Sequence, residues 1–210
     1  MKKINLSDFL KRRPTSEESF QLIESNDLSE LFQIASELRD RGHGNIVSYS
    51  RKIFIPLTKL CRDVCHYCTF SRSPRKNQRS YMTPDEVMGL VRQGEKFGCK
   101  EALFTLGDKP ELRYGSARKE LKKLGHETTL SYLSETAGRV MRETSLLPHI
   151  NAGVMPADEL RNLRKVSVSQ GLMLESVSQH LQQKGGPHHG SPDKVPGVRM
   201  ENIRLAGAAK

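Results

Sequence analysis

The chain has 210 residues, of which 36% are hydrophobic and 28% are charged, and its formal net charge is +10. No apolar run approaches the roughly 18 to 20 residues that span a bilayer, and the charged N-terminal stretch MKKINLSDFLKRRPTSEE lacks the apolar core of a secretory signal. We therefore expect a cytoplasmic protein with no membrane contact. The basic residues are interleaved with 24 acidic ones and tryptophan is absent, so we do not expect nucleic-acid binding.

The first 48 residues are predicted to form a helical extension. Thr15 and Glu18 make a capping-box pattern at the start of TSEESFQLI. The next stretch, NDLSELFQIASELRDRGHG, carries apolar side chains at helical spacing. We therefore divide the chain into an extension of residues 1–48 and a core of residues 49–210.

Strands and helices alternate in the core. The predicted strands are residues 51–58, 101–107, 147–153 and 166–174. The predicted helices are residues 83–98, 128–144, 156–165 and 198–210, and residues 108–120 and 183–197 are predicted loops. This alternation indicates an α/β fold with a parallel sheet. Because chemistry gathers at the carboxyl ends of parallel strands, we expect one active face. Four βα units are fewer than a closed barrel needs, so we expect a partial barrel.

Three cysteines, Cys61, Cys65 and Cys68, follow the first predicted strand with the spacing C-x3-C-x2-C. Soft thiolates select zinc, copper(I) or iron–sulfur clusters. The spacing does not suit paired zinc knuckles, and His66 lies too close to its neighbours to complete a tetrahedral ion. A [4Fe–4S] cubane has four corners, so three cysteines leave one iron free to bind a small molecule. A structural zinc module remains the alternative, and Cys99 is expected to be a small buried residue.

The stretch CRDVCHYC resembles the radical S-adenosylmethionine (SAM) signature, with Tyr67 as the aromatic residue before the last cysteine. The resemblance implies an open (β/α)6 barrel and a [4Fe–4S] cluster held by the three cysteines. It also implies that SAM chelates the fourth iron and that its reductive cleavage yields a 5′-deoxyadenosyl radical, which takes a hydrogen atom from the substrate. An open barrel needs fewer strands than a closed one, so it agrees better with the four strands predicted here.

Longer motifs resemble the FO synthase family, which makes the deazaflavin precursor of coenzyme F-420. They are LTKLCRDVCHYCTF, CKEALFTLGDKPELRY, LPHINAGVM, SQGLMLES and GGPHHGSPDKVPGVR. The resemblance implies a lyase that closes the ring of 7,8-didemethyl-8-hydroxy-5-deazariboflavin with release of ammonia. Its substrate would be a hydroxybenzyl–ribitylaminouracil adduct made by a companion radical SAM subunit. Another radical SAM enzyme, biotin-synthase-like or from menaquinone biosynthesis, is the alternative.

The family that the chain resembles continues past Lys210, into what would be the fifth and sixth strands. We therefore expect a C-terminally truncated chain, a fragment or one piece of a split enzyme. Such a chain would turn over poorly or not at all by itself.

The resemblance also suggests cofactor-binding residues besides the cysteines. Tyr67 is expected to pack against the cluster or the adenine. Gly107 and Asp108 occupy the place of the turn that contacts the amino group of SAM, where glycine allows close approach and a carboxylate suits an ammonium. Glu175, at the end of the fourth strand, is expected near the SAM ribose, and Asn151, at the end of the third, near SAM or the substrate. Each of these positions has a structural alternative, as a core aromatic residue or an ordinary turn.

Other residues are weaker candidates. His149 ends the third strand but is more often structural at such a position. His188 and His189 lie in a glycine- and proline-rich loop that either covers the barrel or is simply solvated. The basic segment Arg72 to Arg79 follows the cysteines and is a candidate docking site for an acidic electron donor of the flavodoxin or ferredoxin type.

Overall fold

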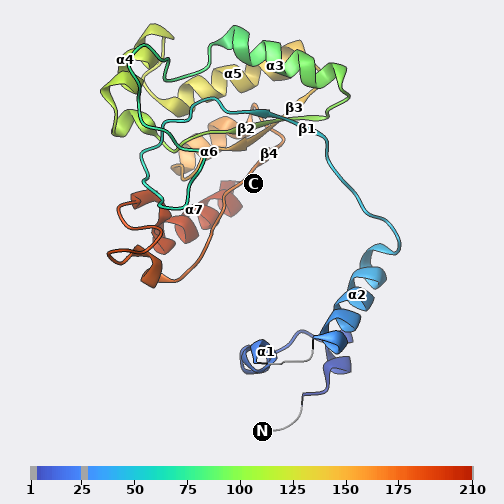
Figure 1. Cartoon of the computed structure of the whole chain (residues 1–210). Coiled ribbons are helices and arrows are strands. Elements are labelled where there is room, and N and C mark those ends of the chain that lie inside the picture. Colours follow the sequence, from blue (N-terminus) through green and yellow to red (C-terminus); the bar gives the residue numbers. More distant parts are fainter. Residues whose placement is uncertain (1–3, 25–27, 210) are drawn as a thin grey trace. The chain divides into compact units, whose positions relative to one another are not determined.

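The structure, a computed structural model, describes residues 4–24 and 28–209. They divide into two compact units, Met1–Tyr49 and Ser50–Lys210 (Figure 1). The first unit contains a 3-10 helix η1 (Leu6–Leu10), helix α1 (Ser16–Ile23) and helix α2 (Ser29–His43). The predicted capping box is present: the Glu18 amide donates to Thr15 Oγ1 at 3.2 Å, and the Thr15 amide donates to Glu18 Oε2 at 2.7 Å. The predicted start of the next helix, at Asn26, lies outside the described residues.

The second unit is built around a parallel sheet of four strands in the order β1-β2-β3-β4. The elements are β1 (Lys52–Ile55), α3 (Pro84–Lys96), β2 (Glu101–Thr105), η2 (Pro110–Leu112), α4 (Gly115–Lys123), α5 (Thr129–Glu143), β3 (Leu147–Asn151), α6 (Ala157–Arg164), β4 (Ser169–Gln170), η3 (Gln179–Gln182), η4 (Pro192–Lys194) and α7 (Pro196–Ala209). The predicted α/β class with parallel strands is confirmed. No helix of the described residues is both long enough and apolar enough to cross a membrane.

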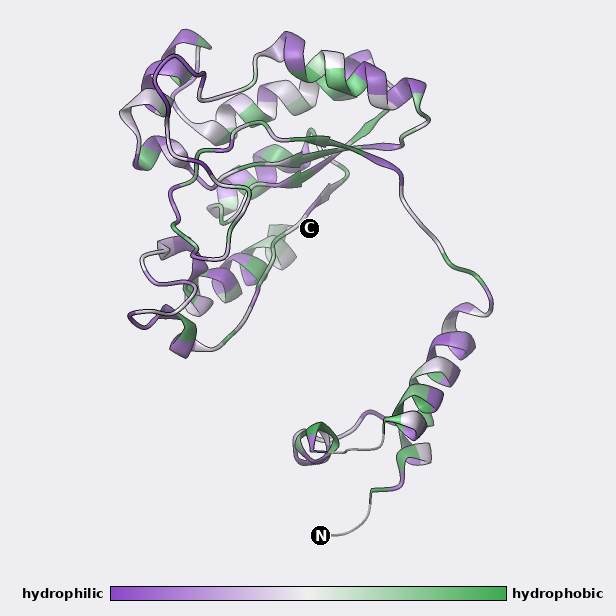
Figure 2. Cartoon of the chain, viewed as in Figure 1, coloured by the Kyte–Doolittle hydropathy of each residue, from purple (hydrophilic) through white to green (hydrophobic). Residues whose placement is uncertain are grey.

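Helices cover one face of the sheet and leave the strand ends free for loops. Helix α3 packs on β1, α5 packs on β3, and α5 also contacts α3 and α6. Figure 1 shows α3, α4 and α5 on the same side of the strands, and Figure 2 shows hydrophobic residues concentrated along the strands. The core between these layers contains fully buried side chains, among them Ile55, Val91, Phe104, Leu133 and Ile150. Burial of each contributes about 1.5–3 kcal/mol, and this core holds the strand ends in place.

Two elements differ from the sequence prediction. Residues 108–120 were predicted as one loop, but Gly115–Lys123 form α4. Its Ala117 and Leu121 are buried one helical turn apart, a pattern that the surrounding charged residues conceal. Strand β4 is only two residues long, Ser169–Gln170, rather than nine. Its ladder with β3 ends at the pair Ile150 and Gln170.

Candidate functional site

The loop after β1 carries the three cysteines and is held against the loop after β2. The amide of Arg62 donates to the carbonyl oxygen of Asp108 at 2.8 Å. The amide of Asp108 donates to the sulfur of Cys61 at 3.2 Å. A β-carbon on Gly107 would overlap the carbonyl oxygen of Leu60. Only glycine therefore allows the two loops to approach this closely.

A cavity of about 220 Å³ opens among the loops that follow the four strands. It is lined by all eight residues predicted as metal ligands or cofactor contacts, namely Cys61, Cys65, Tyr67, Cys68, Gly107, Asp108, Asn151 and Glu175. The carboxyl ends of parallel strands meet at one edge of a sheet, which brings these distant residues together. Their roles as ligands or contacts remain predictions.

The three thiols differ in their surroundings. Cys61 is partly buried, and burial raises the pKa of its thiol to about 11 because desolvation disfavours the thiolate. The sulfur of Cys65 lies 3.5 Å from Ser191 Oγ. Cys68 is exposed, and its sulfur accepts a hydrogen bond from the amide of Ser71 at 3.3 Å. Each sulfur thus has a polar neighbour supplied by the chain itself.

The arrangement of the thiols fits a cluster better than a single ion. Among the described residues, ligand atoms within 4.8 Å of one another are found in the group Asp63, Asp108 and Asp193, and the three thiols form no such group. Thiolates around one tetrahedral zinc ion would stand about 3.8 Å apart, given Zn–S bonds of about 2.3 Å. Irons at separate corners of a cubane hold their thiolates farther apart. The residues present therefore fit a [4Fe–4S] cluster held by three cysteines.

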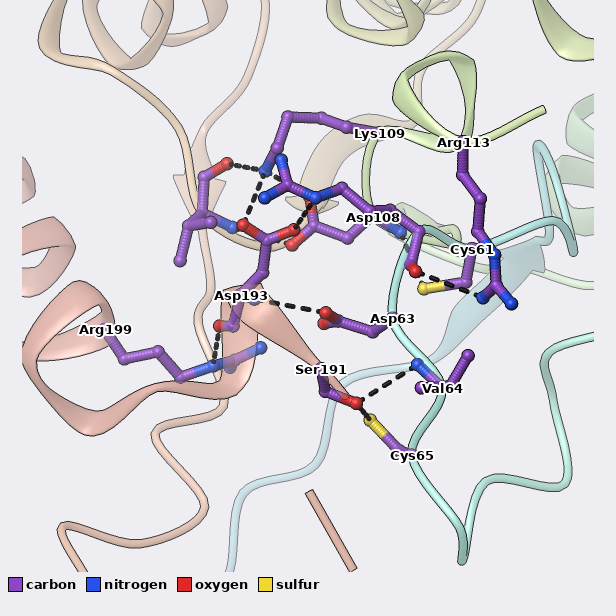
Figure 3. A network of polar contacts seen from close by, with 12 residues as sticks. Cys61, Asp63, Val64, Cys65, Asp108, Lys109, Arg113, Ser191, Asp193 and Arg199 are labelled. Atoms are coloured by element: carbon purple, nitrogen blue, oxygen red, sulfur yellow. Dashed lines mark hydrogen bonds and ion pairs between the residues drawn. The ribbon is translucent and has the colours of Figure 1, made fainter. Parts of the chain in front are cut away.

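Two aspartates of that group, Asp108 and Asp193, already have cationic partners from the chain itself, and Asp63 accepts the amide of Asp193 at 3.1 Å. The ammonium of Lys109 pairs with Asp108 and lies 3.6 Å from Asp193. Nε of Arg62 lies 3.5 Å from Asp193 Oδ2. Burial raises the pKa of Asp108 to about 6, and the neighbouring Lys109 acts in the opposite direction. Figure 3 shows this network beside Cys61 and Cys65.

Residues from the C-terminal third of the unit also line the cavity, among them Glu175, Lys194 and Arg199. Lys194 donates to Glu175 Oε1 at 2.5 Å. Burial acts to raise the pKa of Glu175, but the hydrogen bond from Lys194 and its positive charge outweigh burial, so the pKa of Glu175 is lower than usual. Glu175 has a φ of 66°, an uncommon value for a residue with a side chain. Such strained positions concentrate at functional sites, which supports Glu175 as a site residue.

The histidine candidates have different outcomes. His149 does not line the cavity: it lies two positions before Asn151 on β3, and its Nδ1 is 2.6 Å from Ser169 Oγ. His188 is buried, with Nε2 3.3 Å from Tyr67 Oη. His189 is exposed, and its Nδ1 lies 3.2 Å from the carbonyl oxygen of Gln182. The loop is therefore not simply solvated, because His188 packs against the cysteine-bearing segment.

Sequence reasoning missed three charged residues that line the same cavity: Asp63, Lys194 and Arg199. Asp63 lies between two cysteines, and the other two belong to the motif GGPHHGSPDKVPGVR. Their positions inside these motifs were the signal by which the sequence could have indicated them as site residues. Cys99 is only partly buried and packs against the hydrophobic core, much as predicted for a small core residue.

Comparison with known families identifies this arrangement. The family model described as Radical SAM superfamily matches residues 55–206, which is 152 of the 210 residues. The chain belongs to the radical SAM superfamily. The fold agrees with solved radical SAM structures: HydG, a maturase of the [FeFe]-hydrogenase, superposes with a TM-score of 0.73 at 20% identity, over 97% of this chain and 43% of that one. Methylornithine synthase superposes with a TM-score of 0.69 at 19% identity, over 98% of this chain and 56% of that one.

Within the superfamily, the chain is related to FO synthases. It is 48% identical over 197 residues to the FO synthase of Mycobacterium tuberculosis, a match that covers 87% of this chain and 23% of that protein. It is 44% identical over 165 residues to the 7,8-didemethyl-8-hydroxy-5-deazariboflavin synthase of Methanopyrus kandleri, covering 79% of this chain and 49% of that protein. The chain thus spans between about a quarter and a half of these relatives.

Proposed function

We propose that this radical SAM chain carries the ring-closing activity of FO synthase. The observation that carries the proposal is the single cavity lined by the three thiols together with Gly107, Asp108, Asn151 and Glu175. The relatedness to FO synthases gives the reaction class. The substrate would be the hydroxybenzyl–ribitylaminouracil adduct supplied by a companion radical SAM subunit, and the products would be FO and ammonia. This activity would serve coenzyme F-420 biosynthesis.

The proposed cofactors are a [4Fe–4S] cluster on Cys61, Cys65 and Cys68, and SAM. When bound and reduced, this pair supplies a carbon-centred radical able to remove a hydrogen atom from the substrate. The chain's own residues would orient the nucleotide. The Asp108 carboxylate suits an ammonium group and would exchange its present partner, the Lys109 ammonium, for it. Asn151 and Glu175 offer hydrogen bonds to hydroxyl groups. Tyr67 supplies an aromatic surface at the cavity edge.

Metal loading tests the ligand set. After anaerobic reconstitution of the full chain, we expect about four irons and four sulfides per protein and a brown colour. Substitution of Cys61, Cys65 or Cys68 by alanine should remove most of the iron, because each substitution leaves a second iron of the cluster without a protein ligand. Cys99→Ala is the matched control, since it also removes a thiol, and it should load iron normally. A colourless protein that binds one zinc instead would contradict the proposal.

Turnover tests the reaction itself. The reconstituted chain is incubated with SAM, a reductant and the synthetic adduct, with and without the companion subunit, and FO fluorescence and ammonia are measured. Formation of FO that requires all three cysteines would support the ring-closing activity. Cleavage of SAM with conversion of a biotin-synthase or menaquinone-pathway substrate, and not of the adduct, would favour the alternative, a different radical SAM enzyme.

We further propose that the segment Arg72 to Arg79 receives an acidic electron donor of the flavodoxin or ferredoxin type. All residues of this segment are exposed, and it begins four positions after exposed Cys68. A second cavity, of about 280 Å³, is lined by Cys65, Cys68, Arg72 and Arg113, so positive charge borders the thiols on this side. Opposite charge on a donor would speed the encounter.

Charge reversal tests this docking surface. Arg75→Glu with Lys76→Glu should slow cluster reduction by reduced flavodoxin about tenfold or more at low salt, with a smaller effect at high salt because charge steering is screened. Reduction by dithionite should stay unchanged. Arg161→Glu with Arg164→Glu, on α6, is the control with the same charge change. Equal flavodoxin rates for the two double variants would refute the docking surface.

A further inference from the structure

The cysteine loop, defined here as residues 61–68, is bonded along its length by a segment more than 120 residues away. We call residues 186–194 the brace segment. Three hydrogen bonds donated by backbone amides join the two segments. The His66 amide donates to the Pro187 carbonyl oxygen at 3.0 Å, the Val64 amide donates to Ser191 Oγ at 3.1 Å, and the Asp193 amide donates to Asp63 Oδ1 at 3.1 Å. They involve residues 63, 64 and 66 of the cysteine loop. The middle of the loop is therefore fixed by hydrogen bonds to a distant segment, although it forms no strand.

Side chains add to these bonds. Arg62 pairs with Asp193, and the ring of Tyr67 packs against that of His188 with centroids 5.6 Å apart. Gly190, with a φ of 76°, comes so close to Val64 that an added β-carbon would lie 2.9 Å from Val64 Cγ2. The contact is thus steric as well as polar.

The brace segment is itself firmly held. Of its residues, His188, Ser191 and Asp193 are each at most 4% exposed. The amide of His188 donates to the carbonyl oxygen of Leu181 at 3.0 Å, and Arg199 Nε donates to the carbonyl oxygen of Asp193 at 2.8 Å. With these three buried side chains and two hydrogen bonds, the segment serves as a support rather than as a lid.

Ser191 has a hydrogen bond to spare for the sulfur of Cys65. Its Oγ accepts a hydrogen bond from the Val64 amide, and its hydroxyl hydrogen remains available to donate a second hydrogen bond. The sulfur of Cys65 lies 3.5 Å away. A metal-bound thiolate carries no proton, so in that state Ser191 must be the donor in this pair. Figure 3 shows the hydroxyl between the Val64 amide and the sulfur.

We propose that the brace segment positions the cysteine loop for metal binding, and that Ser191 is a positioning residue whose hydroxyl donates to the Cys65 sulfur of the assembled centre. The second half of this statement rests on the proposed function, because it requires the cluster. A donor to a cluster thiolate stabilises the more negative, reduced state and so raises the reduction potential. Ser191 thereby connects the fold of the C-terminal loop to the ease with which the centre accepts an electron.

Hydrogen exchange in the cluster-free full chain tests the positioning role. Ser191→Ala should speed exchange of the Val64 amide about three- to tenfold, which corresponds to the loss of one hydrogen bond. Ser178→Ala, a change at an exposed serine outside the cavity, should leave it unchanged. Gly190→Ala should also speed exchange across residues 62–67, by pushing the brace away without removing any polar group. Wild-type exchange of the Val64 amide in Ser191→Ala would overturn the proposal.

The reduction potential tests the donor role. In reconstituted protein, Ser191→Ala should take up iron and show a lower midpoint potential than wild type, while Ser191→Thr, which keeps the hydroxyl, should restore it at least in part. An unchanged potential in an iron-loaded Ser191→Ala protein would overturn the donor role. If the wild-type chain assembles no cluster, the proposed function fails, whereas the exchange experiment still decides whether the brace positions the loop.

Discussion

At the scale of single residues, the site depends on the absence of a side chain at Gly107. The close approach of Gly107 to the Leu60 carbonyl allows the Asp108 amide to reach the sulfur of Cys61. The side chain of the next residue, Asp108, is also fixed, because the Val154 amide donates a hydrogen bond to Asp108 Oδ2 at 3.2 Å. One glycine thus positions a thiol and a carboxylate together.

Gly107→Ala should displace the cysteine loop and destabilise the chain, because the new methyl group meets rigid backbone and not a flexible side chain. Overpacking of this kind costs about 1–3 kcal/mol, or more when backbone must move. Urea denaturation and iron content after reconstitution are the measurements. Gly89→Ala, on α3, is the control: its added β-carbon meets nothing within 4 Å, and alanine favours the helix by up to about 1 kcal/mol. Equal stability of the two variants would contradict the steric argument.

At the scale of elements, the helix start signals operate as local chemistry predicts. Thr83 accepts the amide of Glu86 at 3.2 Å, and Glu86 Oε2 accepts the amide of Thr83 at 2.8 Å, which together make the capping box of α3. Helix α5 also has a local cap, since Thr128 Oγ1 accepts the amide of Ser131 at 3.0 Å. In addition, buried Glu111 accepts the amide of Thr129 at 3.1 Å. The two threonine caps can be found from the sequence, and the Glu111 contact needs the fold.

Thr83→Ala should lower the stability of the second unit by about 1 kcal/mol, because the Glu86 amide at the start of α3 loses its acceptor, Thr83 Oγ1. For a chain of this size, the melting temperature should fall by about 2–4 °C. Thr83→Ser keeps the hydroxyl and should recover most of the loss. A melting temperature of Thr83→Ala equal to wild type would show that water replaces the cap at no cost.

The sequence was sufficient for the order and type of the main elements, and for which residues meet at one cavity. Strand-end positions explain this success: Asn151 is the last residue of β3, Cys61, Asp108 and Glu175 lie in the loops after the other strands, and parallel strands end at a common edge. The sequence did not reveal α4, whose apolar positions are only two among many charges. Nor did it reveal Ser191 as a neighbour of Cys65, because that contact joins two loops with no periodic pattern.

At the scale of the whole molecule, the chain consists of two compact units joined near Tyr49. Residues 45–51 form no helix or strand, and Ile46, Val47 and Tyr49 are each about four-fifths exposed (79%, 86% and 81%). The sequence prediction of a boundary between residues 48 and 49 remains a proposal about independent domains, and proteolysis tests it.

Brief digestion of the full chain with chymotrypsin should cut first after Tyr49, because exposed backbone without hydrogen-bonded structure is the preferred site. Mass spectrometry should then find a stable fragment that begins at Ser50. Tyr81 and Tyr132, 3% and 1% exposed in the core, serve as internal controls that should resist cleavage. Early cleavage at either of these would contradict a folded second unit.

The long separation between the brace segment and the cysteine loop has a consequence for biosynthesis. Their contacts join positions 121 to 130 residues apart. At translation rates of about 5–20 residues per second, the sulfur donors leave the ribosome roughly 6 to 26 seconds before the residues that hold them. During that interval the nascent polypeptide carries three reactive thiols with no support. The proposed cluster would therefore meet its supported ligands only after the far segment has emerged.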